Sequence, residues 1–382
     1  MDEEIRAAVE ALHANPLKVA LVVSGGGSQA LAWLLAVPGA TRTLLEAVVP
    51  YGWEAMVGFL GWRPRQYTSR RTAVSMAAAA CARAMRFREA GETVLGVSCT
   101  ASIVSDRPKR GAHRCHVGVW DGGTATTYSL QLEKGLRDRP GEEDVVSRLV
   151  LRALAEGGGL ASGSGVPANL TPGEEVRVKR QPVGRPLERL LEGKVGSVMF
   201  YGPGAMVADE PFRGAVLSGS FNPLHAGHLR LARVAEERLG MPLAFETSVH
   251  NVDKPSLTAA QIEARLPQFV GGPRRLLLSR EPLYKDKAAL YPGSVFVLGY
   301  DTAQRTVDPA YYEGDPGQMR AALEAIREQG CRFLVAGRAQ GGQFLTMDDL
   351  PIPGGYEDLF EGLSESDFRM DLSSTELRER YH

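Results

Sequence analysis

Two histidines three positions apart, His225 and His228, are the residues of this chain best suited to chemistry. A short apolar strand expected at 213–217 and a turn rich in glycine and serine precede them, and the pattern of an amphipathic helix follows. Spacing of i, i+3 puts both imidazoles on one face of the first helical turn, next to its exposed N–H groups and the positive end of the helix dipole. This arrangement predicts a site for a phosphate group.

The composition is that of an ordinary globular protein with two or three domains. The chain has 382 residues, of which 44% are hydrophobic and 23% charged, and its formal net charge is −1. A charge so close to zero argues against a nucleic-acid partner. The apolar runs 30–37 and 75–84 are too short to cross a bilayer, and the acidic start is unlike a secretory signal. Four cysteines in a chain of this length do not make a disulfide framework, so we expect a cytoplasmic protein. Because the apolar runs are short, we also expect no membrane partner.

Strand and helix patterns alternate in the last part of the chain, residues 213–382. Near-continuous apolar strands separated by helices predict a Rossmann-like, doubly wound α/β domain with a parallel sheet, in which ligands bind beyond the carboxyl ends of the strands. The polar residues that follow the strands should therefore share one edge. The expected strands are 215–218, 243–249, 275–279, 294–299 and 332–336, and the expected helices are 229–239, 258–268, 285–290 and 318–329.

The first part of the chain, residues 1–156, predicts a separate α/β domain. Residues 157–212 are expected to connect the two domains, because 157–165 has the composition of a flexible linker and 186–191 could form only one short helix. In 1–156 the expected strands are 18–23, 93–98, 116–120 and 124–130, with the last two paired, and the expected helices are 29–37, 69–90 and 142–156.

Two motifs in the last domain resemble the adenylyltransferase/cytidylyltransferase superfamily. Gly-Ser-Phe-Asn-Pro-Leu-His-Ala-Gly-His at 219–228 resembles its signature, and Ser-Ser-Thr-Glu-Leu-Arg at 373–378 resembles its second hallmark, Ser-Ser-Thr-x-x-Arg. Gly-Tyr-Asp at 299–301 is similar to the Gly-x-Asp segment of nicotinamide mononucleotide adenylyltransferases, and Arg338 to an arginine that follows a later strand in them. The resemblance covers 213–382.

The resemblance implies a nucleotidyltransferase that moves a nucleoside monophosphate, AMP from ATP, to a phosphate-bearing acceptor and releases pyrophosphate. It implies nicotinamide mononucleotide (NMN) or nicotinate mononucleotide as the acceptor and Mg²⁺, carried with ATP, as the cofactor. The implied catalytic residues are His225, His228 and Arg378. The implied nucleotide-binding residues are Ser218, Gly219, Ser220, Phe221, Asn222, Gly227, Ser373, Ser374 and Thr375, and the implied acceptor-binding residues are Lys254, Gly299, Asp301 and Arg338.

Elementary chemistry agrees with this reaction. The second pKa of a phosphate monoester is about 6, so the acceptor is already mostly dianionic at neutral pH and needs no general base. Catalysis then consists of aligning two polyanions and neutralising the developing charge, for which hydrogen-bond donors suffice. Other interpretations stay open: Ser373–Thr375 as an ordinary helix cap, Asp301 as a cap, and Lys285 and Lys287 as solvated rather than phosphate-binding lysines.

Residues 18–130 resemble the C-terminal domain of the CinA family, which includes NMN deamidases. Val-Ser-Gly-Gly-Gly-Ser at 23–28 stands where that family has Glu-Ser-Cys-Thr-Gly-Gly, and Tyr-Gly-Trp-Glu-Ala-Met at 51–56 where it has Tyr-Ser-Asn-Glu-Ala-Lys. Met56 replaces a lysine, and a thioether cannot activate a serine. We therefore expect a degenerate domain in which Ser24 and Tyr51 are a relic amidase site, with the glycine turn 25–27 either holding a phosphate or simply joining strand to helix.

Two alternative functions are kept: an NMN amidase that uses Ser24, and a non-catalytic protein that binds nucleotides. His113, Cys115 and His116 lie close together, but a structural zinc ion needs four ligands, so we assign no metal site to protein side chains. Formation of a homo-oligomer is left open.

Overall fold

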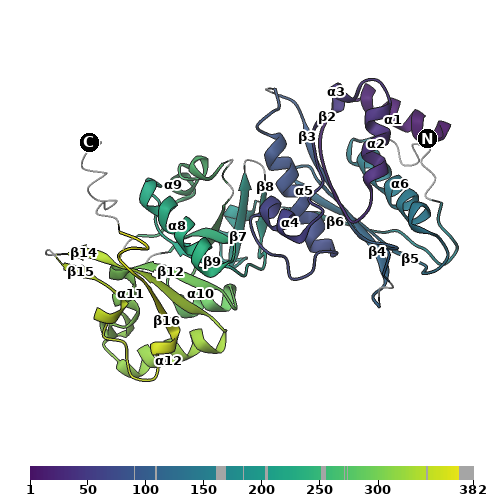
Figure 1. Cartoon of the computed structure of the whole chain (residues 1–382). Coiled ribbons are helices and arrows are strands. Elements are labelled where there is room, and N and C mark those ends of the chain that lie inside the picture. Colours follow the sequence, from purple (N-terminus) through teal and green to yellow (C-terminus); the bar gives the residue numbers. More distant parts are fainter. Residues whose placement is uncertain are drawn as a thin grey trace. The chain divides into compact units, whose positions relative to one another are not determined.

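The computed structural model describes residues 1–89, 91–107, 110–160, 169–183, 185–202, 205–250, 255–270, 272, 274–340 and 343–369 (Figure 1). The chain folds into two compact units and passes between them more than once. The first unit comprises Met1–Leu60, Pro64–Arg185 and Tyr201–Val207, and the second comprises Gly61–Arg63, Pro186–Phe200 and Ala208–His382.

The first unit is built on a six-stranded sheet in the order β2-β1-β3-β4-β5-β6. β2, β1 and β3 are parallel, and β3 to β6 pair antiparallel. The strands are β1 (Lys18–Ser24), β2 (Leu44–Val48), β3 (Val94–Ser102), β4 (His113–Trp120), β5 (Thr124–Leu132) and β6 (Arg177–Pro182). The expected antiparallel pairing of 116–120 with 124–130 is thus confirmed.

Helices cover both faces of this sheet (Figure 1). α4 (Trp53–Leu60) and α5 (Arg70–Ala84) lie on one face, and α1 (Glu3–Ala14), α2 (Ser28–Ala36) and α6 (Arg139–Gly157) lie on the other, while the short α3 (Ala40–Thr43) leads into β2. Val97, Val117 and Leu149 are at most 1% exposed in the core that the sheet shares with α1, α2 and α6.

Glycines in the facing strands explain why alanine is the commonest residue of α5. A Cβ atom at Gly96 would lie 1.9 Å from the carbonyl oxygen of Ala77, and one at Gly118 would lie 2.6 Å from that of Ala73. Ser98 Oγ donates to the Ala73 oxygen over 2.6 Å. The helix backbone therefore rests directly on the sheet, which only small side chains allow.

The expected helix 69–90 was too long. α5 ends at Ala84, and residues 86–89 are exposed, so a longer helix would have no apolar face to bury. Five elements of this unit were not predicted: α1, α3, β2, α4 and β6.

The second sheet has eight strands in the order β16-β13-β12-β9-β10-β11-β7-β8, and those from β16 to β11 belong entirely to the second unit. The strands from β16 to β11 in this order are parallel, as predicted, while the unpredicted β7 joins β11 antiparallel. β9 is central, with β10 on one side and β12 on the other, so the strand order reverses there; ligands bind at such a point. The bounds are β7 (Ser197–Gly202), β8 (Ala205–Ala208), β9 (Ala215–Ser218), β10 (Leu243–Ser248), β11 (Arg275–Ser279), β12 (Val295–Gly299), β13 (Arg332–Ala336) and β16 (Phe360–Leu363).

The helices of the second unit follow the predicted alternation with one exception. The expected helix 258–268 is interrupted, because Pro267 disfavours helical geometry at the preceding residue and lacks an N–H donor. The helices are α7 (Pro186–Leu191), α8 (Ala226–Leu239), α9 (Ala259–Glu263), α10 (Tyr284–Leu290), α11 (Tyr300–Thr306) and α12 (Pro316–Glu328), with 3₁₀ turns at Leu266–Phe269, Pro309–Tyr312, Met347–Asp349 and Glu357–Leu359 and a hairpin of β14 (Arg338–Gln340) and β15 (Gln343–Leu345).

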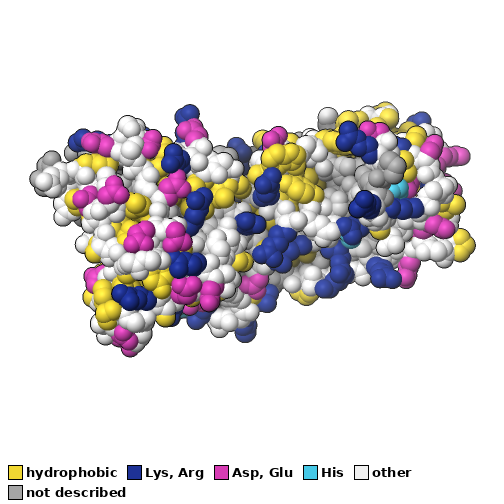
Figure 2. All heavy atoms as spheres, turned by 60° about the horizontal axis from the view of Figure 1, so that its bottom comes forward, with side chains coloured by type: hydrophobic (Ala, Val, Ile, Leu, Met, Phe, Trp, Pro, Cys, Tyr) yellow, Lys and Arg dark blue, Asp and Glu magenta, His cyan; other side chains and the backbone are white. Residues whose placement is uncertain are grey.

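Within the described part of the chain, no helix combines the length and the apolar character that crossing a membrane requires. Figure 2 shows one face of the molecule, over which basic and acidic side chains are interspersed with small apolar areas.

The close packing of α5 generates a test. Gly96→Ala should destabilise the first unit by about 3 kcal/mol or more, since the added methyl group meets backbone that cannot move aside. Gly58→Ala in α4 is the matched control, because a Cβ there meets nothing within 4 Å and should stabilise the helix by about 0.5–1 kcal/mol. Urea unfolding of both variants measures the difference, and equal stabilities would contradict the packing argument.

Candidate functional site

The turn after β9 is clamped to the neighbouring strand. The Gly219 N–H donates to the Glu246 carbonyl oxygen over 2.9 Å, and Thr247 Oγ1 donates to the Gly219 carbonyl oxygen over 3.0 Å. Further along, Arg265 Nε donates to the Ser220 carbonyl oxygen over 3.2 Å. The turn is thus held in place by backbone and side chains outside it.

Phe221 packs beneath this turn. It has a positive φ of 43°, which a bulky residue adopts only under constraint, and its side chain is 1% exposed. Its ring stands edge-on to His228 at 5.0 Å and to Phe245 at 5.1 Å between centroids. The expected nucleotide contact of Phe221 is therefore restricted to its backbone, and its side chain orients His228 instead.

The two histidines cap α8 and stack on each other. His225 is the N-cap residue, and its Nδ1 accepts the Gly227 N–H over 3.2 Å, while His228 Nδ1 accepts the His225 N–H over 3.3 Å. The ring centroids are 3.7 Å apart with an interplanar angle of 28°. Because each Nδ1 accepts a hydrogen bond, each neutral ring carries its proton on Nε2 and is a hydrogen-bond donor there.

Both rings are neutral at physiological pH. Burial lowers the pKa of His225, and burial together with the neighbouring His225 lowers the pKa of His228 to about 4. The pair therefore presents two N–H donors rather than two cations. Such donors can stabilise charge that develops on a phosphoryl oxygen without first binding the ground state tightly.

The structure brings two of the expected acceptor-binding residues together. Asp301, in the first turn of α11, and Arg338, at the start of β14, form an ion pair, and their side chains are 49% and 48% exposed. Gly299 is the N-cap residue of α11, and Asp301 directs its carboxylate to Arg338, so the alternative role of Asp301 as a helix cap is wrong. The cap position is also exposed, which leaves the Gly299 backbone accessible.

Lys254 and the second motif, with Ser373, Ser374, Thr375 and Arg378, lie outside the described residues. The described chain ends beside the histidine helix: Arg230 of α8 donates to the Arg369 carbonyl oxygen over 3.2 Å and lies over the Phe368 ring at 5.8 Å.

Sequence reasoning missed a buried acid next to this turn. Glu246 is 0% exposed, and its Oε2 lies 2.6 Å from Lys287 Nζ. Lys287 is only 4% exposed, so it is not the phosphate ligand or solvated lysine that the sequence suggested. The available signal was a single charged residue inside the expected strand 243–249.

In the first unit, the candidate relic site is small. Ser24 Oγ donates to the Pro50 carbonyl oxygen over 3.1 Å, so the end of β1 meets the segment that leads to Tyr51. Tyr51 is 66% exposed, and Met56 is 2% exposed. The hydroxyl of Ser24 is thus engaged by a backbone oxygen and not by a group that could deprotonate it.

The phosphate interpretation of the turn 25–27 is wrong, because a carboxylate of this chain occupies the helix start that follows. Glu143 Oε1 accepts the Ser28 N–H over 2.6 Å, the Ser28 hydroxyl over 2.8 Å and the Gln29 N–H over 3.2 Å. The turn itself is made of glycine for a steric reason, since a Cβ at Gly25 would lie 2.0 Å from the Ala101 carbonyl oxygen.

Strand alternation separates the residues that suggested a metal. His113 Nδ1 lies 2.7 Å from Glu142 Oε1, whereas His116 projects from the other face of β4 and its Nδ1 lies 2.9 Å from Ser129 Oγ. The two imidazoles therefore cannot share one ion with Cys115.

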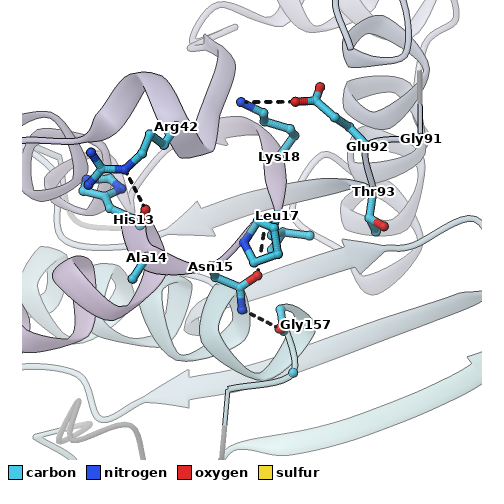
Figure 3. Close-up of a pocket in the computed structure, with 13 residues that line it drawn as sticks. His13, Ala14, Asn15, Leu17, Lys18, Arg42, Gly91, Glu92, Thr93 and Gly157 are labelled. Atoms are coloured by element: carbon cyan, nitrogen blue, oxygen red, sulfur yellow. Dashed lines mark hydrogen bonds and ion pairs between the residues drawn. The ribbon is translucent and has the colours of Figure 1, made fainter. Parts of the chain in front are cut away.

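A groove of about 1080 Å³ lies at the amino ends of β1 and β3 (Figure 3). Its polar groups are already paired with each other: Lys18 with Glu92 at 3.4 Å, Arg42 with the His13 carbonyl oxygen at 3.0 Å, and Asn15 with the Gly158 carbonyl oxygen at 3.0 Å. We assign no site to this groove, which lies at the opposite ends of the strands from Ser24.

The family comparison concerns the part of the chain that carries the two histidines. A family model described as cytidylyltransferase-like matches residues 216–380. This part of the chain is a cytidylyltransferase-like domain. It makes the protein a nucleotidyltransferase, as the two motifs predicted.

Similar proteins were found for both parts of the chain. A protein of Gloeobacter violaceus named as a probable nicotinate-nucleotide adenylyltransferase is 28% identical over 182 residues, covering 43% of this chain and 82% of that protein. Solved structures similar to the N-terminal part include the competence/damage-inducible protein CihA of Agrobacterium tumefaciens, with 16% identity, 41% of this chain, 97% of that chain and a TM-score of 0.34. A CinA superfamily protein of Enterobacter cloacae has 20% identity, 42% of this chain, 91% of that chain and a TM-score of 0.32.

Substitution of Glu143 tests the role of the carboxylate at the start of α2. Glu143→Ala should destabilise the protein by about 1–3 kcal/mol, because it leaves the donors of Ser28 and Gln29 without their acceptor. Glu143→Gln keeps an acceptor oxygen and should cost less. Urea unfolding measures both, and equal losses would show that the hydrogen bonds are not what Glu143 contributes.

The histidine cap generates a second test. The unfolded chain takes up a proton at His228 below about pH 6.5, whereas the folded chain does so only near pH 4, so stability should fall as the pH drops through this interval. Uptake of one proton can lower the free energy of unfolding by at most about 1.4 kcal/mol per pH unit. His228→Asn retains an acceptor for the His225 N–H and should flatten this dependence in urea unfolding at pH 4–7. An unchanged slope would contradict the lowered pKa.

Proposed function

We propose that the cytidylyltransferase-like domain transfers AMP from ATP to nicotinate mononucleotide or NMN and releases pyrophosphate. The observation that carries this proposal is the stacked pair of neutral imidazoles at the start of α8, at the point where the strand order reverses. The name of the similar Gloeobacter violaceus protein supports nicotinate mononucleotide as the acceptor.

In this reaction the acceptor phosphate attacks the α-phosphorus of ATP. A P–O bond forms to the acceptor, the bond to the β-phosphate oxygen breaks, and pyrophosphate leaves with the electron pair. The acceptor brings no proton that must be removed, because it is already mostly dianionic. The Nε2–H groups of His225 and His228 donate to phosphate oxygens as their charge rises during the transfer.

The other groups of the site position the two substrates. The Gly219 N–H is engaged by the Glu246 carbonyl oxygen, so Gly219 shapes the turn and does not itself donate to phosphate. Gly227 is buried in the first turn of α8, at the positive end of the helix dipole, where a glycine lets a ligand approach the backbone closely. Asp301 and Arg338 would hold the acceptor, the arginine by its phosphate. Mg²⁺ would arrive on the triphosphate oxygens and supply further charge neutralisation, since the imidazoles, amides and hydroxyls around the turn attract a hard cation less than phosphate oxygens do.

Pyrophosphate release by the purified chain with Mg-ATP and either mononucleotide tests the proposal. His225→Ala should lower kcat/KM by about 10²–10³-fold, the usual loss when one transition-state donor is removed, and far more than Ser24→Ala. His225→Asn, which retains a good helix cap, should fold as stably as the wild type yet show a similar loss.

The outcomes also separate the alternatives. Release with neither mononucleotide but with another phosphate monoester would overturn the acceptor assignment alone. Ammonia release from NMN that Ser24→Ala abolishes would support the amidase, for which the engaged hydroxyl of Ser24 offers no support. Tight Mg-ATP binding without product from any acceptor would favour a non-catalytic nucleotide-binding protein.

A further inference from the structure

An ion pair is buried under the carboxyl edge of the second sheet. Lys287 Nζ of α10 lies 2.6 Å from Glu246 Oε2 of β10, and the side chains are 5% and 0% exposed. Removing two such charges from water costs several kcal/mol per ion, and an apolar pair of similar volume is often as stable. Stability alone therefore does not account for the pair, and its other contacts show what it does.

Those contacts reach the ends of three adjacent strands. Lys287 Nζ also donates to Ser218 Oγ over 3.3 Å, and Glu246 Oε1 accepts from Ser279 Oγ over 2.6 Å and from Ser248 Oγ over 3.1 Å. The three serines are the last residues of β9, β11 and β10. One buried pair thus ties together the sheet edge at which this class of fold binds ligands.

The contact with Ser218 continues into the histidine site. Ser218 precedes Gly219, whose N–H and carbonyl groups are also held by β10. Two residues later the ring of Phe221 packs against His228. Ser218, Gly219 and Phe221 thus form a short, well-held segment that links Lys287 to the His228 ring. The position of Ser218 therefore affects the position of this ring.

The charges of the pair suit this purpose. Hydrogen bonds from an ammonium group are stronger and shorter than those between neutral groups. The Lys287 ammonium divides its donors between Glu246 and Ser218, and it also lies 5.0 Å from the centre of the Tyr284 ring. These contacts orient the ammonium group, so its hydrogen bond can hold the Ser218 hydroxyl in one position.

We propose that Lys287 and Glu246 are positioning residues for nucleotidyl transfer, which act through Ser218 on the phosphate-binding turn and on His228. Neither residue needs to touch a substrate. This inference rests on the proposed function, since the turn and the histidine are assigned to nucleotide binding there.

The test compares kcat/KM for ATP in three variants. Glu246→Met with Lys287→Met replaces the pair by apolar side chains of similar size, so it should keep a melting temperature close to that of the wild type and lose at least tenfold in kcat/KM. Ser218→Ala should also lose at least several-fold. The triple variant should be no worse than the Glu246→Met/Lys287→Met variant, because the serine acts only when the lysine holds it.

A control lies in the first unit, where Arg137 and Glu174 form an ion pair at 2.7 Å with side chains that are 15% and 1% exposed. Arg137→Met with Glu174→Met should leave kcat/KM unchanged. Losses that multiply in the triple variant, or an unchanged kcat/KM in the Glu246→Met/Lys287→Met variant, would overturn the proposal.

A second measurement tests the positioning role even if the Glu246→Met/Lys287→Met variant does not fold or the wild type lacks the proposed activity. Ser218→Ala leaves the ion pair intact and removes the hydroxyl that contacts Lys287 and the Tyr284 side chain, so amide hydrogen exchange in a peptide covering 216–222 should become faster while exchange in the first unit stays the same. Unchanged exchange in that peptide would overturn the positioning role. Absence of pyrophosphate release by the wild type with every acceptor would overturn the proposed function instead.

Discussion

Two backbone N–H groups at the start of α8 donate to the Nδ1 atoms of His225 and His228, and the chemistry of the site depends on these two hydrogen bonds. They fix the tautomer of each ring, and with it the atom that carries the proton. They also place the rings one above the other; burial lowers the pKa of both rings, and the neighbouring His225 lowers that of His228 further. The same two residues therefore both start the helix and carry the N–H donors.

The first unit shows the opposite use of a similar element. Its glycine turn and helix start have the shape of an anion site, yet Glu143 reaches across from α6 and provides the anion from within the chain. The neighbouring Glu142 binds His113 and the Val104 N–H in the same way. In both units, backbone N–H groups at a helix start donate to side chains of the chain itself. In the first unit the acceptor is the Glu143 carboxylate, which has no proton to donate, whereas in the second the acceptors are imidazoles, each with an Nε2–H that can donate to a ligand.

Much of this arrangement could be predicted from local patterns. The strands 275–279 and 332–336 were predicted with their observed bounds, because each is a short apolar run between clear turn signals. The i, i+3 histidines were placed on one face of a helix for a reason that holds in any helix. β7, β8 and β16 were missed because short strands in segments rich in glycine, proline and charge carry little signal of their own and form only when a partner strand is present.

Contacts between distant residues could not be predicted at all. No spacing rule links Glu246 to Lys287, which are separated by 41 positions, or Glu143 to Ser28, which are separated by 115. In both cases the sequence shows an ordinary charged residue, and only the folded chain shows that it is buried and engaged. The ion pair of Asp301 with Arg338 belongs to the same class, although family resemblance had already drawn attention to both residues.

The path of the chain has a consequence for dissection of the protein. β6 of the first sheet comes after the glycine- and serine-rich stretch 157–165, and β7, which pairs with β11 of the second sheet, comes before residue 213. A fragment that ends at 156 would lack the outermost strand of its sheet, and a fragment that begins at 213 would expose the hydrogen-bonding edge of β11. Such truncations would favour aggregation, so the activity of the protein is best studied with the polypeptide intact.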